Sequence, residues 1–211
     1  MLYWMTPDPI VAEPTMTLLE VRSLMVQHGI RRLPVVEGDD LCGMIGRSDL
    51  YRWCRPDILY GDIDTATETS LGRIRVSDAM THEPLTCSAY DHIETLAARM
   101  AREKKGAYPV LNRGHLVGVI SESDVMRAVV ELTHRGEPGR RITVSLAPGE
   151  EGVLYRIVDL CRRSQLELHA VLTHTVLDES ALLVTVRVEG DDVETFVKAL
   201  WDANYKVLEV S

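Results

Sequence analysis

Residues 41–52, LCGMIGRSDLYR, return 75 positions later as residues 116–127, LVGVISESDVMR. The match extends back to residue 5 without a gap, and 12 of the 48 positions from 5 to 52 are identical in the two copies. Ordinary residue frequencies would give about three identities by chance. Two copies of one supersecondary unit therefore explain the first two thirds of the chain. The identical positions in copy one are Met5, Thr6, Pro9, Met25, Pro34, Val35, Leu41, Gly43, Ile45, Ser48, Asp49 and Arg52.

Both copies predict the same order of elements: a short extended piece, a helix, two strands joined by a turn, and a second helix. The first helix starts with a capping-box pattern, and Ser48 and Ser123 are N-cap candidates for the second helix. The capping-box pairs are Thr17 with Glu20 and Asp91 with Glu94. The expected extended pieces are residues 10–11 and 85–86, and the expected strands are residues 33–37, 41–45, 108–112 and 116–120. Residues 54–73 match nothing in the other copy and predict a polar connection.

The last third of the chain carries a different pattern. Residues 137–139, EPG, have linker chemistry and mark a boundary. After them the pattern predicts strands at residues 140–146, 166–175, 181–188 and 206–210, and amphipathic helices at residues 152–164 and 193–201. The resulting order, βαββαβ, predicts a ferredoxin-like unit.

The motifs of the two copies resemble the cystathionine β-synthase (CBS) domain family. Each copy has Met-Thr-x-x-Pro, then a helix, then a strand with Pro-Val, then a Gly-led strand followed by Ser-Asp. Over residues 1–132 the chain is similar to a CBS pair, or Bateman module. The resemblance implies an α+β fold of two βαββα repeats. Repeat one would be residues 1–60, and repeat two with its preceding connection residues 61–136.

Residues 137–211 resemble an ACT domain, because Gly152-Val153-Leu154 opens the first helix directly after a strand. Members of that family that bind amino acids commonly carry Asp or Asn three residues before this glycine. That position is Gly149 here, and Glu150 and Glu151 would repel the carboxylate of an amino acid. A CBS pair followed by an ACT-like domain resembles the family of bacterial acetoin-utilisation accessory proteins.

Residues 118–124, GVISESD, are the strongest candidate for ligand chemistry. A strand ends and a helix starts here, so free N–H groups and the helix dipole would favour a phosphate. Ser121 and Ser123 add hydroxyl donors, and the Asp124 carboxylate can accept two hydrogen bonds from a ribose diol. Helix capping alone is the alternative explanation of Ser123 and Asp124.

The CBS resemblance implies an adenosyl ligand at this place. In CBS pairs the Asp motif contacts the ribose and phosphate of an adenosine ligand, and the opposite repeat supplies the pocket wall. Arg31 and Arg32 stand where basic residues of the family can reach phosphates, and a solvated surface pair is the alternative for them. The implied contact residues are Thr6, Ile10, Val11, Ile30, Arg31, Arg32, Val119, Ile120, Ser121, Ser123 and Asp124.

The parallel segment of copy one predicts a second, weaker site. Gly46 stands where copy two has Ser121, so one hydroxyl donor is lost. In copy two, Gly106 and Ala107 occupy the positions of the two arginines, although two lysines lie just upstream. The residues expected at this second site are Thr81, Thr86, Met44, Ser48 and Asp49.

Composition argues against several classes of function. The net charge of −9 disfavours binding to nucleic acid or to an anionic membrane surface. No window holds the run of about 18 apolar residues that a membrane helix needs. The cysteines and histidines have no zinc-site spacing, so no metal ligands are expected. The start of the chain has no signal-peptide pattern, and the cysteines fit a reduced compartment, so we expect a cytoplasmic protein.

Together the patterns predict a regulatory module without catalytic residues. We expect it to sense an adenine nucleotide or S-adenosylmethionine between the repeats, with no required cofactor. The ACT-like domain would relay binding to a partner protein or within a homodimer. An oligomerisation or adaptor protein with vestigial ligand sites is the alternative, favoured by Gly46 and Gly149. An enzyme is not expected, because Cys87, the one thiol near histidines, has no identifiable orienting group.

Overall fold

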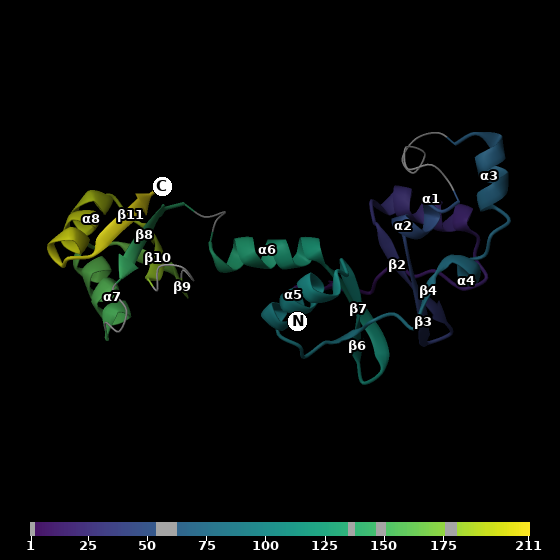
Figure 1. The fold of residues 1–211 in the computed structure, drawn as a ribbon, viewed down its shortest axis with the longest axis horizontal. Coiled ribbons are helices and arrows are strands. Elements are labelled where there is room, and N and C mark those ends of the chain that lie inside the picture. The colour runs from purple at the N-terminus through teal and green to yellow at the C-terminus, as the bar shows by residue number, and fades with distance from the viewer. Residues whose placement is uncertain (1–2, 54–62, 135–137, 147–150, 176–180) are drawn as a thin grey trace. The chain divides into compact units, whose positions relative to one another are not determined.

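A computed structural model of the chain describes residues 3–53, 63–134, 138–146, 151–175 and 181–211 (Figure 1). Contacts within the chain divide it into two compact units, Met1–Met126 and Arg127–Ser211. Within the described ranges, no helix is both long enough and apolar enough to cross a membrane. The turn residues Gly149 and Glu150 lie outside the described ranges.

The first unit holds both copies of the repeat, and each copy is built around a β-hairpin. The hairpin strands lie within one residue of the predicted bounds at each end, because alternating apolar residues and turn chemistry mark them clearly in the sequence. Copy one consists of α1 (Leu18–His28), β2 (Arg32–Glu37), β3 (Asp40–Gly46) and α2 (Arg47–Leu50). Copy two consists of α5 (Ile93–Glu103), β6 (Ala107–Asn112), β7 (His115–Ser121) and α6 (Glu122–Leu132), and α6 crosses the boundary between the units.

The first strand of each copy lies in the sheet of the other copy. β1 (Thr6–Pro7) pairs with β7, and β4 (Thr81–His82) pairs with β3, both antiparallel. β5 (Cys87–Ser88) completes one sheet in the order β1-β7-β6-β5, and the other sheet has the order β2-β3-β4. In copy one, Ala12 makes an isolated parallel bridge in place of β5. The extended pairings thus lie one or two residues after the expected segments 10–11 and 85–86.

Two repeated glycines explain how the strand exchange closes. A Cβ placed on Gly118 would lie 2.6 Å from the Met5 sulfur and 2.8 Å from the backbone oxygen of Thr6. A Cβ on Gly43 would overlap the Met80 sulfur. Each glycine therefore leaves room for the methionine that precedes the exchanged strand of the opposite copy. This contact gives a physical reason for the Met and Gly identities between the copies.

The expected polar connection between the copies is wrong in part. Residues 54–62 lie outside the described ranges, but the rest forms α3 (Thr65–Leu71), followed by α4 (Val76–Ala79). Leu71 is fully buried and belongs to the core of copy one, together with Leu18 of α1. Since Leu71 is one apolar residue among polar neighbours, the periodicity did not show this packing.

The predicted helix caps are confirmed at one position and wrong at three. Thr17 and Glu20 form a reciprocal capping box at α1. At α5 the N-cap is His92, with no side-chain hydrogen bond, and the Asp91 carboxylate accepts the Ser88 N–H at 3.0 Å instead. The strands β3 and β7 run up to the following helices without a gap. The other N-cap candidates, Ser48 and Ser123, therefore lie inside the first helical turn.

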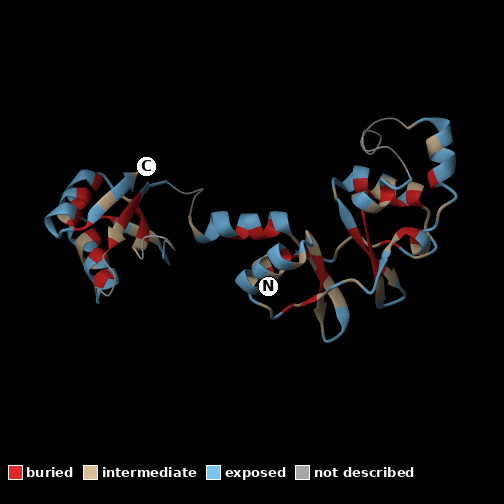
Figure 2. Cartoon of the chain, viewed as in Figure 1, coloured by how far each residue is buried: buried red, intermediate tan, exposed pale blue. Residues whose placement is uncertain are grey.

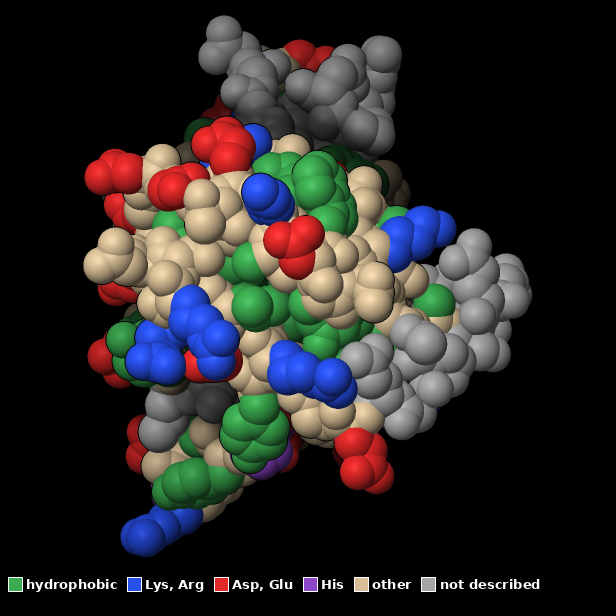
Figure 3. Space-filling model, turned by 90° about the vertical axis from the view of Figure 1, so that its left-hand side faces the viewer, with side chains coloured by type: hydrophobic (Ala, Val, Ile, Leu, Met, Phe, Trp, Pro, Cys, Tyr) green, Lys and Arg blue, Asp and Glu red, His purple; other side chains and the backbone are tan. Residues whose placement is uncertain are grey.

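The second unit has the predicted order βαββαβ. Its elements are β8 (Arg140–Leu146), α7 (Val153–Arg163), β9 (Glu167–Thr175), β10 (Leu182–Glu189), α8 (Val193–Asp202) and β11 (Lys206–Val210). The antiparallel sheet has the order β11-β8-β10-β9. Val144 and Val186 of the sheet belong to one buried core with Ile157 and Phe196 of the helices. Figure 2 colours the buried residues of these strands and helices red. Figure 3 looks onto the side where α7 and α8 lie. Large hydrophobic side chains remain exposed on both helices: Leu154, Tyr155, Val158 and Trp201.

Candidate functional site

Two cavities in the first unit lie where the two copies of the repeat meet. The first, the Asp124 pocket, has a volume of about 370 Å³, and the second, the Asp49 pocket, has a volume of about 310 Å³. The Asp124 pocket is lined by Thr6, Asp8, Pro9, Ile10, Gly29, Ile30, Arg31, Arg32, Gly106, Ala107, Val119, Ser121, Glu122, Ser123 and Asp124. The Asp49 pocket is lined by Arg32, Met44, Gly46, Ser48, Asp49, Arg52, Thr81, Pro84, Leu85, Lys104, Lys105, Gly106, Ala107 and Pro109.

The two pockets are related by the 75-residue repeat. A residue that lines one pocket usually has its repeat counterpart in the other, as Thr6 and Thr81 do. Since the exchanged strands β1 and β4 carry these threonines, each pocket has walls from both copies. Neither copy could therefore form either pocket alone.

The Asp124 carboxylate lies at the start of α6, between the end of β7 and the first helical turn. Its Oδ2 accepts hydrogen bonds from the Ser121 N–H at 2.8 Å and from the Ser121 hydroxyl at 2.7 Å. Asp124 is only 6% exposed, although it lines the pocket. The Ser121 hydroxyl thus donates to Asp124 and orients this carboxylate, and its expected donation to a ligand stays a prediction.

The Asp49 carboxylate repeats this geometry with one hydrogen bond fewer. Its Oδ2 accepts the Gly46 N–H at 2.8 Å, and Gly46 offers no hydroxyl. Asp49 is also less buried than Asp124. The carboxylate of the second pocket is therefore held by fewer hydrogen bonds, because glycine replaces serine at the end of the strand.

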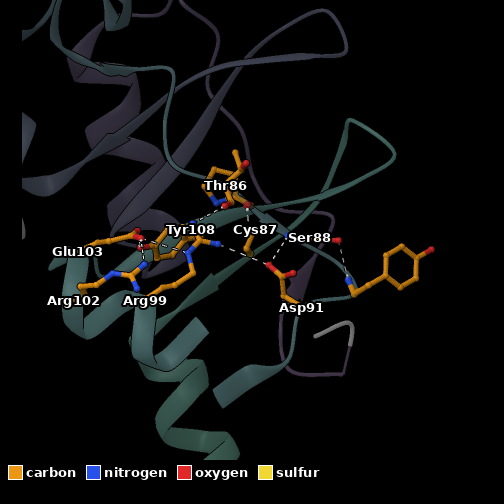
Figure 4. Close-up of polar contacts among 10 residues, drawn as sticks. Thr86, Cys87, Ser88, Asp91, Arg99, Arg102, Glu103 and Tyr108 are labelled. Atoms are coloured by element: carbon orange, nitrogen blue, oxygen red, sulfur yellow. Dashed lines mark hydrogen bonds and ion pairs between the residues drawn. The ribbon is translucent and has the colours of Figure 1, made fainter. Parts of the chain in front are cut away.

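The structure brings most of the predicted contact residues together. The exceptions at the first site are Val11, which does not line the Asp124 pocket, and Ile120, which is fully buried in the core of copy two. At the second site Thr86 does not line the Asp49 pocket. Its carbonyl oxygen accepts a hydrogen bond from Arg99 Nη2 at 3.1 Å, on the α5 side of the sheet (Figure 4).

Several charged lining residues were not assigned to a site from the sequence. Asp8 and Glu122 line the Asp124 pocket, and Arg52, Lys104 and Lys105 line the Asp49 pocket. The repeat itself carries a signal for the lysines, since they stand at the positions of two residues that line the Asp124 pocket. Transferring the pocket position by position through the 75-residue offset would have found them.

Arg32 lines both pockets. Its Cγ lies 3.2 Å from where a Cβ on Gly46 would stand, and its two terminal nitrogens lie 2.9 and 3.0 Å from where a Cβ on Gly106 would stand. Glu122 Oε2 lies 3.1 Å from that second point. Two glycines therefore leave space for the Arg32 side chain between the pockets. Arg31 lines the Asp124 pocket only, so both predicted arginines face this region.

A polar network between α5 and the sheet of copy two holds this helix against the sheet (Figure 4). The Tyr108 hydroxyl donates to Glu103, and Arg99 Cζ lies 5.0 Å from the centre of the Tyr108 ring. Arg99 also lies 3.6 Å from Glu103 Oε1 and 3.9 Å from Asp91 Oδ2. Burial, with the Glu103 hydrogen bond and charge, raises the pKa of Tyr108 to about 12. This network therefore has a structural role.

The three thiols in the described ranges, Cys42, Cys87 and Cys161, do not offer a nucleophile at neutral pH. Burial and the nearby Asp91 charge raise the pKa of Cys87 to about 11, and burial also raises the pKa values of Cys42 and Cys161. The thiolate is the reactive form of cysteine, so these side chains stay unreactive. Among the described residues, no group of three or more His, Cys, Asp or Glu side chains is placed to hold a metal ion.

Comparison with known proteins adds to this geometry. The CBS domain family model matches residues 2–55 and 76–131, which is just over half of the chain. The chain is 30% identical over 125 residues to the uncharacterized protein MJ1225 of Methanocaldococcus jannaschii; the match covers 59% of this chain and 45% of that protein. The chain therefore spans less than half the length of this curated relative.

Solved structures share the fold of the first unit. CBSX2 in complex with AMP is 24% identical, with a TM-score of 0.52 over 62% of this chain and 96% of that one. A Vibrio cholerae protein described as an acetoin utilization protein (AcuB) is 23% identical, with a TM-score of 0.52 over 65% of this chain and 96% of that one. With the family model matching both copies of the repeat, the chain belongs to the CBS domain family, as a tandem CBS pair.

Proposed function

We propose that the chain is a regulatory module that binds an adenosyl ligand in the Asp124 pocket, with the ribose diol on the Asp124 carboxylate. The observation that carries this proposal is a buried carboxylate, oriented by Ser121, in the wall of a cavity of about 370 Å³. An ionised carboxylate is a strong acceptor for two hydroxyl donors.

The rest of the pocket suits the other parts of such a ligand. Ile10, Ile30 and Val119 offer an apolar wall for an adenine ring, and Arg31 and Arg32 offer guanidinium groups for a phosphate. CBSX2 holds AMP, which supports the adenosyl class, although its likeness to this chain extends to the fold alone. AMP, ADP, ATP and S-adenosylmethionine all contain the groups that these residues would recognise. No catalytic step is proposed.

We also propose that residues 137–211 form an ACT-like domain of the ferredoxin-like fold that relays ligand binding to a partner protein or within a homodimer. The βαββαβ order and the sheet order β11-β8-β10-β9 support the fold. Tyr155 and Trp201, 85% and 59% exposed, support self-association of this unit. Light scattering should give a mass of twice 23.7 kDa. A single monomeric species at micromolar protein would contradict the homodimer.

The location proposed for the protein is the cytoplasm.

The test of ligand binding is Asp124→Asn, which keeps the shape and the acceptor oxygen but removes the charge. Losing charge-assisted hydrogen bonds to the ribose costs about 1.5–3 kcal/mol, which is roughly a tenfold to 150-fold loss of affinity. Calorimetry with AMP, ATP and S-adenosylmethionine would measure this loss. The ligand-induced rise in melting temperature is the second readout, because it separates binding from any change in the stability of the free protein.

Asp49→Asn is the matched control, since Asp49 holds the same position in the other pocket. It should leave most of the response at the Asp124 pocket intact. The adaptor alternative gains support if none of the three ligands binds the wild-type protein at millimolar concentration. The Asp124 and Asp49 carboxylates would then act only as helix caps.

A further inference from the structure

A third cavity lies in the second unit, on the face of the sheet opposite to the core formed with α7 and α8. Along β10, Val184, Val186 and Val188 belong to that core, so the alternating residues Thr185 and Arg187 face the other side. This cavity, the Arg187 pocket, has a volume of about 190 Å³. All of its described lining residues belong to the second unit: Thr133, Arg141, Ala170, Leu172, Thr185 and Arg187.

Two arginines from neighbouring strands line this pocket together. Arg187 of β10 lies directly opposite Arg141 of β8 in the antiparallel register. Side chains in such a pair have Cβ atoms about 4.5–5.5 Å apart, and like charges at this spacing destabilise a sheet. Among the described residues that line the pocket, none is acidic. An anion held between the two guanidinium groups would therefore replace a repulsion with two attractions.

The polar groups of the pocket differ in how firmly they are held. Arg187 is only 7% exposed, whereas Arg141 is exposed. The Thr185 hydroxyl is buried and lies 3.0 Å from the Thr143 hydroxyl. Burial therefore fixes one guanidinium group and one hydroxyl group in place, while the exposed arginine can adjust to a ligand.

The nearest carboxylate along β10 belongs to Glu189, two residues after Arg187. Its Oε2 lies 2.9 Å from His169 Nε2, and Glu189 does not line the pocket. The acidic side chain of this strand thus interacts with a histidine outside the pocket lining, and the pocket keeps its positive charge.

We propose that the Arg187 pocket binds the carboxylate of a small 2-oxo acid. The planar guanidinium groups of Arg141 and Arg187 match the two oxygens of a carboxylate. The Thr185 hydroxyl offers a polar partner for the oxo group, and Ala170 and Leu172 offer an apolar wall for a short aliphatic chain. This site is separate from the Asp124 pocket and does not rest on the proposed function.

The size and charge of the pocket disfavour other ligands. Pockets for drug-sized molecules have volumes of about 300–1,000 Å³, so this smaller cavity suits a small acid rather than a nucleotide. An amino acid would bring an ammonium group beside two guanidinium groups, and no acidic residue of the described lining could pair with it. A 2-oxo acid carries the same carboxylate without that positive charge.

The test is calorimetric titration of the full chain with pyruvate, 2-oxobutyrate and 2-oxoisovalerate. At least one of these acids should bind the wild-type protein at millimolar concentration. Arg141→Gln and Arg187→Gln should each lower its affinity at least about tenfold, because each removes charge-assisted hydrogen bonds. Since Arg141 is exposed, Arg141→Gln should keep the fold even if loss of the buried Arg187 lowers the free energy of unfolding.

Arg162→Gln is the matched control within the same unit. Arg162 is exposed on α7 and does not line the pocket, and its partner Asp159 keeps a second ion pair with Arg163 at 2.7 Å. This variant should bind the acids as the wild type does. Two analogues of 2-oxoisovalerate test the ligand class: L-valine adds the ammonium group, and 3-methyl-2-butanone lacks the carboxylate. Both should bind at least about tenfold more weakly than 2-oxoisovalerate.

Several outcomes would overturn the inference. They are failure of all three acids to bind the wild-type protein, unchanged affinity in Arg141→Gln, and tighter binding of L-valine than of 2-oxoisovalerate. Equal binding of inorganic phosphate would indicate a site for any oxoanion and would overturn the assignment to a carboxylic acid. Asp124→Asn should leave the binding of 2-oxo acids intact, so this inference and the adenosyl proposal can fail separately.

Discussion

Replacing Gly118 with alanine tests the contact that joins the two copies of the repeat. The added methyl group would lie 2.8 Å from the backbone oxygen of Thr6 and 2.6 Å from the Met5 sulfur. The sulfur can move, but the backbone oxygen is held by the pairing of Thr6 with Val119. Inserting a methylene-sized group into a packed site costs about 1–3 kcal/mol, and we expect the upper part of that range.

Gly43→Ala is the internal control for this prediction. The three atoms nearest to its methyl group all belong to the Met80 side chain, a flexible thioether. We expect it to cost about 1 kcal/mol or less, because Met80 can change rotamer.

The assay is urea unfolding followed by tryptophan fluorescence. Trp4 packs against the core of copy two, so its emission reports on the first unit, while Trp53 and Trp201 are largely exposed. Gly118→Ala should lower the unfolding midpoint well below that of Gly43→Ala. Equal midpoints for the two variants, or a neutral Gly118→Ala, would refute the argument from backbone contact.

Two further predictions concern the cores of the two copies. Tyr108→Phe should cost about 0.5–1.5 kcal/mol at neutral pH by removing the hydrogen bond to Glu103. Because the folded-state pKa of Tyr108 is raised from 10 to about 12, this tyrosine stabilises the fold fully below pH 10, and the contribution is lost as the pH rises to 12. Alkaline unfolding should therefore be less steep in the variant; an unchanged pH profile would contradict this. Leu71→Ala should cost about 2–5 kcal/mol in thermal or urea unfolding, whereas the exposed Thr69→Ala should change stability little. Equal effects would mean that α3 does not pack on the core.

The sequence predicted the elements whose signal is local. Alternating apolar residues and a tight turn define each hairpin within its own span, and the repeat placed Ser-Asp at the same point in both copies. The capping box of Thr17 and Glu20 was equally local. Copy two lacks it because the Asp91 carboxylate binds the Ser88 N–H, a competition that spacing alone does not reveal.

The features that the sequence missed depend on a distant partner. β1 and β4 are two residues long, and only the hairpin of the other copy makes them strands. The Thr86 carbonyl oxygen accepts a hydrogen bond from Arg99 of α5, which is far from it in the sequence. The Arg32 side chain lies between the pockets because two glycines from different copies leave space for it. Periodicity within one segment carries no signal for such contacts.

The exchange of β1 and β4 also bears on how the chain folds. β7 closes its sheet with a strand from the start of the chain, so copy two cannot complete its core until this distant pairing forms. Pairing across such a span gives a high contact order, and we expect folding of the first unit to be slow and concerted rather than copy by copy. A single copy on its own would leave the edge of its hairpin unpaired, and such an edge recruits a second chain. In this chain the repeat supplies that second copy, and β1 and β4 pair within the chain the edges that a single copy would leave open.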